Sequence, residues 1–331
     1  METRKRVMKL TRRAFLHLAA GTAAVPALPQ LASALDYPTR PVRLITGFAA
    51  GGAADISARL VAQSLSERLG RQCIVENHTG AGGNIATEEV VRAAPDGYTL
   101  LNCTFSNAVS AALFPALKFD FVRDIAPVAG SVRLPLILLV NPAVAAETVS
   151  EFIALAKANP GRINFPSAGI GSSEHMAGEL FKMMAGVDMV HVPFRGGAPA
   201  ITALIAGQVQ AYFCATPTSL SGIKAGMRAL GVTTATRLEA LPDVPTLAET
   251  LPGYEVSVWF GIGAPRNTVA EIIDKLNEAI NAGLVEPGLK NRLGDLGGVP
   301  MPMTPVGFGR LIAAETEKWA TVVREAKIKV D

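Results

Sequence analysis

Short apolar runs typical of buried β-strands alternate with helical patterns along most of the chain. The expected strands lie at 42–46, 73–76, 99–104, 136–140, 164–166, 189–194, 211–214 and 229–233. The expected helices between them lie near 55–69 and 85–94, over 148–158, and from Ser173 and Pro199 onward. This alternation predicts an α/β protein with mostly parallel sheets.

The last part of the chain departs from this alternation. A strand expected at 256–262 is followed by helices near 269–283 and 306–326. Thr304 and Pro305 supply an N-cap and a proline at the first position of the last helix. If this tail packs on the first part, the chain crosses twice between two lobes, and two crossings form a hinge.

We therefore expect a two-lobed protein with a ligand cleft between its lobes. The first lobe is discontinuous, with residues 35–134 and 254–331, and the second is continuous, with residues 135–253. A simple tandem arrangement of two domains is the alternative that the sequence leaves open.

The first 34 residues have the features of an export signal. They carry a net charge of +5, against +3 for the whole chain. Arg12 and Arg13 precede a short, alanine-rich apolar run, and the small residues that end at Ala34 resemble a cleavage site. We expect a twin-arginine signal peptide that is cleaved near Ala34 and a periplasmic protein. An uncleaved amphipathic helix is the alternative.

Charge and motif spacing argue against several classes of function. Beyond the leader the chain is close to neutral, which disfavours a nucleic-acid groove, and no run is long enough for a membrane helix. No GxSxG elbow or Walker motif occurs, so we expect neither an enzyme nor a cofactor. Metal-ligand spacing is absent from the histidines and cysteines beyond the leader, which are His78, His175, His191, Cys73, Cys103 and Cys214. Whether the cysteines pair is left open.

A glycine-rich loop follows the first expected strand and precedes the first helix. It offers backbone N–H groups and the positive end of a helix dipole to an anion, and its residues are Gly47, Phe48, Ala49, Ala50, Gly51 and Gly52. Asp55 follows in the first helical turn. Its side chain either stabilises the helix or meets a ligand, and the sequence does not decide between these roles.

A second loop of the same kind lies in the second lobe. Its residues are Ser167, Ala168, Gly169, Ile170, Gly171, Ser172 and Ser173, and the helix that follows contains His175. Ser172 or Ser173 is a natural N-cap. Two such loops, one from each lobe, predict a site in which helix N-termini hold a carboxylate without needing an arginine.

Several further residues at strand ends are candidates for the same site. Ser106 and Thr216 could line the cleft or only cap the next turn, and Arg195 could reach an anion or face solvent. A third glycine-rich turn at 80–83 precedes Asn84, but it lacks the last glycine of GxGxxG.

Taken in order, these motifs resemble the substrate-binding proteins of tripartite tricarboxylate transporters, the Bug receptor family. The resemblance covers nearly the whole chain after the leader. Its most specific pieces are Phe48-x-x-Gly51-Gly52-x-x-Asp55-x-x-Ala58-Arg59, Gly80-Ala81-Gly82-Gly83, Ala94-Pro95-Asp96-Gly97-Tyr98-Thr99-Leu100, Val192-Pro193-Phe194-Arg195-Gly196, Leu241-Pro242-Asp243-Val244-Pro245-Thr246 and Trp259-Phe260-Gly261.

The resemblance implies a type II periplasmic-binding-protein fold with a hinge. It also implies a carboxylate held by backbone amides and ordered waters, with contacts from Phe48 to Gly52 and Asp55, from Ser167 to Ser172, and with His175 nearby. We expect a monomer that delivers its ligand to the permease subunits of a transporter. A sensing module that signals to a kinase, and an exported hydrolase using Ser172 or Ser173, are the alternatives.

This sequence departs from the family pattern at three places. Ala50 stands where proline is usual, Phe194-Arg195 where Tyr-Lys is common, and Cys103-Thr104-Phe105 where serine and threonine are common. The latter two change the polarity expected near the ligand. The resemblance therefore leaves the identity of the carboxylate open.

Overall fold

The computed structural model describes residues 36–114, 116–194 and 196–328. The predicted signal peptide and its cleavage near Ala34 therefore lie outside the described residues, as does Arg195. Residues Tyr37–Asp331 form one compact unit. Within the part of the chain that the structure describes, no helix is long and apolar enough to cross a membrane.

The first three strands form a parallel group that agrees closely with the sequence pattern. β1 (Val42–Thr46) lies between β2 (Cys73–Asn77) and β3 (Thr99–Thr104). α2 (Ala53–Leu69) and α3 (Asn84–Val91) connect them. The glycine-rich turns before α2 and α3 therefore lie at the carboxyl ends of parallel strands, the edge at which α/β proteins bind ligands.

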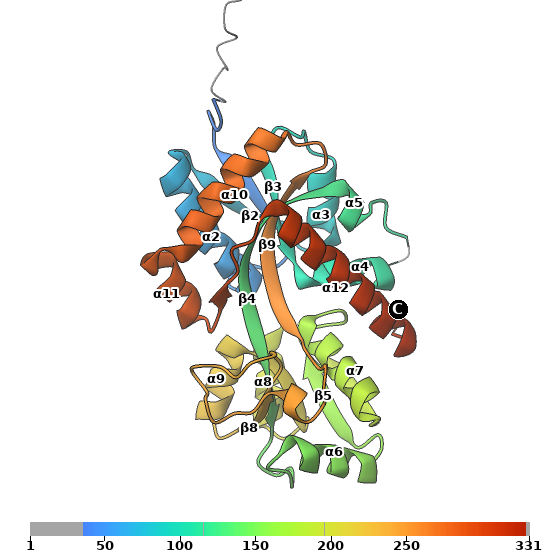
Figure 1. Ribbon diagram of the computed structural model, residues 1–331. Helices are drawn as coiled ribbons and strands as arrows, with labels where there is room; N and C mark the ends of the chain where they lie inside the picture. The colour runs from blue at the N-terminus through green and yellow to red at the C-terminus, as the bar shows by residue number, and fades with distance from the viewer. Residues whose placement is uncertain (1–35, 115, 195, 329–331) are drawn as a thin grey trace, which may run out of the picture. The chain divides into compact units, whose positions relative to one another are not determined.

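The expectation of mostly parallel sheets is wrong. β9 (Ser257–Pro265), β4 (Ile125–Val140) and β10 (Val299–Pro300) extend the sheet in the order β10-β4-β9-β3-β1-β2, and every pair that includes β4 or β9 is antiparallel. The first part of β4 pairs with β9, and its last residues pair with β7 (Ala211–Ala215) and β8 (Arg228–Val232). Figure 1 shows β4 and β9 running side by side.

β4 has 16 residues, of which the sequence pattern predicted only the last five. Pro127 and Pro135 interrupt the pattern, because proline cannot donate to a sheet ladder. The structure accommodates this composition with register shifts against β9 between Pro127 and Ala129 and between Gly130 and Val132.

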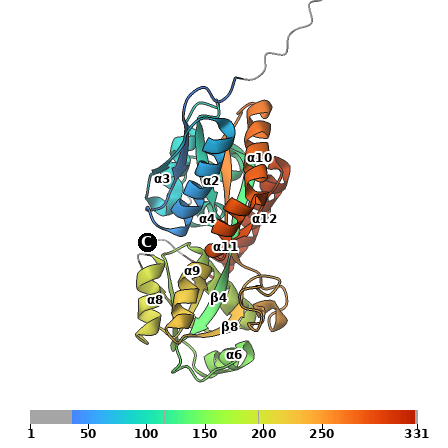
Figure 2. The same cartoon turned by 90° about the vertical axis from the view of Figure 1, so that its left-hand side faces the viewer.

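Three strands of the second series lead directly into helices. β5 (Ile163–Ser167) pairs in parallel with β6 (Met189–Pro193). β5 is followed by α7 (Ser173–Ala185), β6 by α8 (Gly197–Ile205) and β7 by α9 (Thr216–Lys224), while α6 (Val149–Ala158) precedes β5. Figure 2 shows α9 beside the end of β4 that belongs to this series, and α8 next to α9.

Some short elements were missed by the sequence pattern. They are α4 (Phe105–Leu113), α5 (Phe121–Asp124), α9, α11 (Pro287–Asp295) and the 3-10 turns Ala81–Gly83 and Leu247–Glu249. α4 begins directly at the end of β3 with a capping box formed by Thr104 and Asn107. Its apolar composition continues that of the strand, so the pattern gives no boundary between them.

The tail returns to the first sheet. β9 pairs with β3 and β4, and α10 (Ala270–Val285) and α12 (Pro305–Glu325) follow it. The predicted cap is confirmed, since Thr304 accepts a hydrogen bond from the Gly307 N–H (3.1 Å). α12 packs on α4, with the rings of Trp319 and Phe105 4.9 Å apart. The division into lobes near Leu134 and Tyr254 stays a prediction.

Candidate ligand-binding site

A pocket of about 230 Å³ is formed by four segments that are distant in the sequence. Its lining residues are Phe48, Gly82, Ser106, Ser110, Leu113, Phe114, Ala168, Gly169, Ile170, Gly171 and Ser172. The pocket therefore brings together the first loop, the turn before α3, helix α4 and the second loop.

Six of the predicted site residues line this pocket: Phe48, Ser106, Ala168, Gly169, Gly171 and Ser172. The other described ones are not part of its lining, namely Ala49, Ala50, Gly51, Gly52, Asp55, Ser167, His175 and Thr216. The Thr216 hydroxyl donates to the Pro135 carbonyl oxygen (2.7 Å), which ties α9 to β4. The ligand contacts assigned to these residues and to Arg195 stay predictions.

Three lining side chains lie outside the predicted contact ranges, those of Ser110, Leu113 and Phe114, whereas Ile170 lies within the predicted range from Ser167 to Ser172. Ser110 lies one helical turn after Ser106, so the helical period would have indicated it if α4 had been predicted. The apolar residues could not be recognised from the sequence, because an apolar residue that lines a pocket looks the same there as one that is buried in the core.

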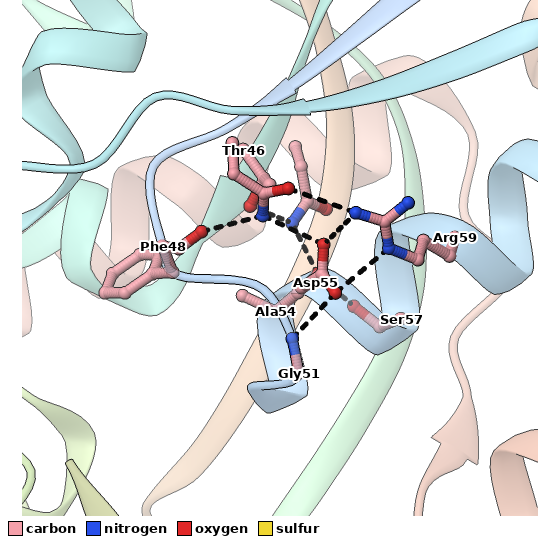
Figure 3. Close-up of polar contacts among 9 residues, drawn as sticks. Thr46, Phe48, Gly51, Ala54, Asp55, Ser57 and Arg59 are labelled. Carbon is pink, nitrogen blue, oxygen red and sulfur yellow. Dashed lines mark hydrogen bonds and ion pairs between the residues drawn. The ribbon is translucent and has the colours of Figure 1, made fainter.

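The carboxylate of Asp55 holds the first loop in place (Figure 3). It accepts hydrogen bonds from the Gly51 N–H (2.9 Å), the Arg59 Nε (3.0 Å) and the Asn77 Nδ2 (2.8 Å). Asn77 also donates to the Phe48 carbonyl oxygen (2.9 Å), so both ends of the loop are attached to the same pair of side chains.

Asp55 is buried, and burial alone would raise its pKa. The hydrogen bonds from Arg59, Gly51 and Asn77 outweigh burial, so the pKa of Asp55 lies below its usual value and the carboxylate is charged at neutral pH. Because its oxygens already accept these three donors, the contacts favour a loop-positioning role for Asp55 over a direct ligand contact.

The second loop is held by hydrogen bonds to two histidines. The Gly171 N–H donates to His175 Nδ1 (3.1 Å). The Ser167 hydroxyl is 2.6 Å from His191 Nε2 and accepts from the Gly169 N–H (3.1 Å). The two imidazole rings are stacked, with centroids 3.8 Å apart. Both ends of the loop therefore rest on this histidine stack.

Burial keeps both imidazoles neutral. It lowers the pKa of His175 to about 3, with smaller contributions from His191 and Lys182, and lowers the pKa of His191 to about 4. A neutral His175 ring leaves Nδ1 free to accept, as its contact with the Gly171 N–H requires.

The histidine stack predicts acid sensitivity. An unfolded histidine binds a proton near pH 6.5, whereas His175 and His191 in the folded chain resist protonation until about pH 3 and pH 4. Between those values the unfolded state binds more protons, so the free energy of unfolding falls as pH falls. We expect His175→Gln to remove about 2 kcal/mol of the loss between pH 6.5 and 5. Urea unfolding at both pH values measures this change. NMR titration midpoints above pH 6 for these rings would contradict it.

Several amides of the two loops are already used inside the protein. Gly51, Gly169 and Gly171 donate to side chains, and Gly52 and Ser172 donate to the carbonyl oxygens of Ala49 and Gly169. The loop N–H groups for which the described residues supply no acceptor include those of Ala49, Ala50, Ala168 and Ile170, and also those of Gly47 and Phe48. The glycines thus shape the loops, and the neighbouring N–H groups are left for an anion.

The serines of the second loop have structural partners. Ser172 caps α7 by accepting from the His175 N–H (3.3 Å), and Ser173 donates to the buried Glu174 carboxyl (3.1 Å). Within the described ranges, neither hydroxyl is hydrogen-bonded to an imidazole that could act as a base. Cys73, Cys103 and Cys214 are free thiols. Among the residues described, no cluster of three His, Cys, Asp or Glu side chains could hold a metal ion.

Known structures of solute-binding proteins share this fold. A structure described as R. palustris Rpa4515 with adipate is 35% identical, with a TM-score of 0.80 over 89% of this chain and 99% of that one. MatC (Rpa3494) from Rhodopseudomonas palustris with bound malate is 34% identical, with a TM-score of 0.76 over 87% of this chain and 100% of that one. The predicted class, an α/β periplasmic-binding-protein fold, is confirmed.

Sequence comparison gives the family. Protein BugT of Bordetella pertussis (strain Tohama I) is 36% identical over 302 residues, which cover 90% of this chain and 93% of BugT. The family model described as tripartite tricarboxylate transporter family receptor matches residues 57–328. The chain belongs to this receptor family, as its motifs predicted.

Proposed function

We propose that this receptor captures a small carboxylate in the pocket between its two glycine-rich loops and delivers it to the permease subunits of a tripartite transporter. The observation that carries the proposal is that a single pocket is lined by both Phe48 and residues 168–172. Adipate and malate in the two neighbouring structures are carboxylates of the size that such a pocket admits.

The carboxylate is held mainly by the second loop. Ser172 caps the N-terminus of α7, where the helix dipole favours a negative charge. The N–H groups of Ala168 and Ile170 lie in the segment that leads to this terminus and have no other described acceptor. The Ser106 hydroxyl adds a donor from α4. Arg195, next to Phe194 at the end of β6, is a further candidate for the same charge.

The same proposal includes the place and mode of action. The twin-arginine leader exports the chain, cleavage near Ala34 releases it into the periplasm, and the protein acts there as a monomer without catalysis or cofactor. A sensing role would use the same pocket and differs only in the partner that recognises the loaded protein.

Isothermal titration with a panel of carboxylic acids tests the proposal. We expect saturable one-to-one binding of at least one acid among citrate, malate, adipate and benzoate, and loss of binding when its carboxylate is replaced by the neutral amide. The amide is the matched control, because it keeps the shape and removes the charge. A folded protein that binds no acid of the panel, or that binds acid and amide equally, would count against carboxylate capture.

A further inference from the structure

We infer that this pocket selects carboxylates with a hydrocarbon body over hydroxylated or tricarboxylic acids. The inference rests on the proposed function, because it concerns the same site. It follows from the unequal distribution of apolar and free polar groups around the pocket.

The apolar part of the lining is large. Its side chains are those of Phe48, Leu113, Phe114 and Ile170, which come from three different segments. Ile170 is 41% exposed and is one of eleven exposed large apolar side chains among the described residues. A ligand in the pocket would cover part of this surface, and burying apolar surface favours binding of an apolar body.

Three of these apolar side chains pack beside glycines of the neighbouring turns. A Cβ on Gly83 would lie 3.4 Å from the Phe48 ring, and a Cβ on Gly82 would lie 3.6 Å from the Phe114 ring. A Cβ on Gly171 would lie 2.6 Å from Leu113 Cδ1. Leu113 therefore packs closer to the Gly171 backbone than a Cβ would allow, whereas a Cβ on Gly82 or Gly83 would come only into van der Waals contact with the Phe114 and Phe48 rings.

Few polar side chains line the pocket, and they are the serines Ser106, Ser110 and Ser172. The Ser110 hydroxyl donates to the Ser106 carbonyl oxygen (2.8 Å), and the Ser172 hydroxyl accepts from the His175 N–H (3.3 Å). Among the described lining residues, the side-chain O–H groups left to donate to a ligand are those of Ser106 and Ser172. A ligand with several hydroxyl groups would leave some of them unpaired on burial, which weakens its binding.

Adipate and galactarate make a matched pair of ligands for the test. Both have a six-carbon chain and two terminal carboxylates, and galactarate carries four hydroxyl groups in addition. We expect adipate to bind at least about 10-fold more tightly than galactarate, because each buried methylene is worth about 4-fold in affinity. Citrate and benzoate extend the comparison to a tricarboxylate and an aromatic acid.

Ile170→Ser and Ile205→Ser are the matched variants. Ile205 in α8 has nearly the same exposure, 42%, and lies outside the pocket lining, so its variant controls for a general change in the surface. We expect Ile170→Ser to weaken adipate binding about 5-fold with little effect on galactarate, and Ile205→Ser to change neither.

The outcomes separate this inference from the proposed function. Tighter binding of adipate and benzoate, reduced by Ile170→Ser alone, supports it. Equal or tighter binding of galactarate or citrate overturns the selectivity and leaves carboxylate capture intact. If the folded protein binds none of these four acids and also does not bind malate, both the selectivity and the proposed carboxylate capture are overturned.

Discussion

Replacing Gly171 by alanine should weaken carboxylate binding about 10-fold or more in a protein that still folds. Gly171 has φ +78°, and a Cβ there would lie 2.6 Å from Leu113 Cδ1. The end of the Leu113 side chain can move, but it lines the pocket, so its displacement changes the ligand space. A left-handed alanine also costs about 1–2 kcal/mol of stability. Titration calorimetry and urea unfolding measure the two effects separately.

Gly186→Ala is the matched control for this variant. Gly186 is the C-cap of α7, the helix that follows the second loop, and its φ is +62°. A Cβ added to Gly186 would meet no atom within 4 Å. We expect a similar loss of stability and unchanged affinity. An equal loss of affinity in both variants would show that backbone strain, and not the geometry of the pocket, governs binding.

Asp55→Ala should cause the largest combined loss of stability and affinity among single changes near the site. It leaves the Gly51 N–H and the Asn77 amide without their shared acceptor, in a position where the Asp55 side chain is 4% exposed. Removing the acceptor of buried donors costs about 1–3 kcal/mol. The Gly51 end of the loop then loses its attachment, and the bond from Asn77 to the Phe48 carbonyl oxygen remains as the hold on the other end, so the position of Phe48 in the pocket is fixed less firmly. Urea unfolding and calorimetry with the same acid measure both losses.

Glu88→Ala supplies the control for Asp55→Ala. Glu88 forms an i,i+4 ion pair with Arg92, as Asp55 does with Arg59, but its side chain is 34% exposed and lies on α3. Such a pair contributes about 0.5 kcal/mol or less. Comparable effects of the two substitutions would contradict the positioning role.

The pH dependence of the Asp55 contribution has a definite sign. Hydrogen bonds lower the pKa of Asp55 below its unfolded value. Its contribution to stability is therefore complete above about pH 4 and is lost as pH falls through the lower folded pKa. Asp55→Asn should remove this part of the acid destabilisation and keep the size of the side chain.

Much of the first sheet could be predicted from local pattern alone. β1 and β3 agree with the expected strands residue for residue, and β2 extends by one residue. β4 could not be predicted in full, because Pro127 and Pro135 interrupt its pattern, and the pairing with β9, including the register shift after Pro127, depends on a partner that is distant in the sequence. The direction of the strands was also mispredicted, because it depends on which strands pair, and these partners are distant in the sequence.

The site was predictable where backbone geometry determines it. The two glycine-rich loops follow from their positions between strand and helix, and the structure places residues of both on one pocket. The partners that shape them, Asn77 for the first loop and His191 for the second, have no signature because they act through tertiary contacts. Leu113 and Phe114 were missed because they look like core residues until their contacts with Gly171 and Gly82 are known.

A crystal structure of the protein with adipate tests the central claim most directly. We predict that one carboxylate lies within hydrogen-bond distance of the Ala168 or Ile170 N–H, and that the carbon chain contacts Phe48 and Phe114. Adipate bound elsewhere, or bound without any contact to residues 168–172, would contradict the account.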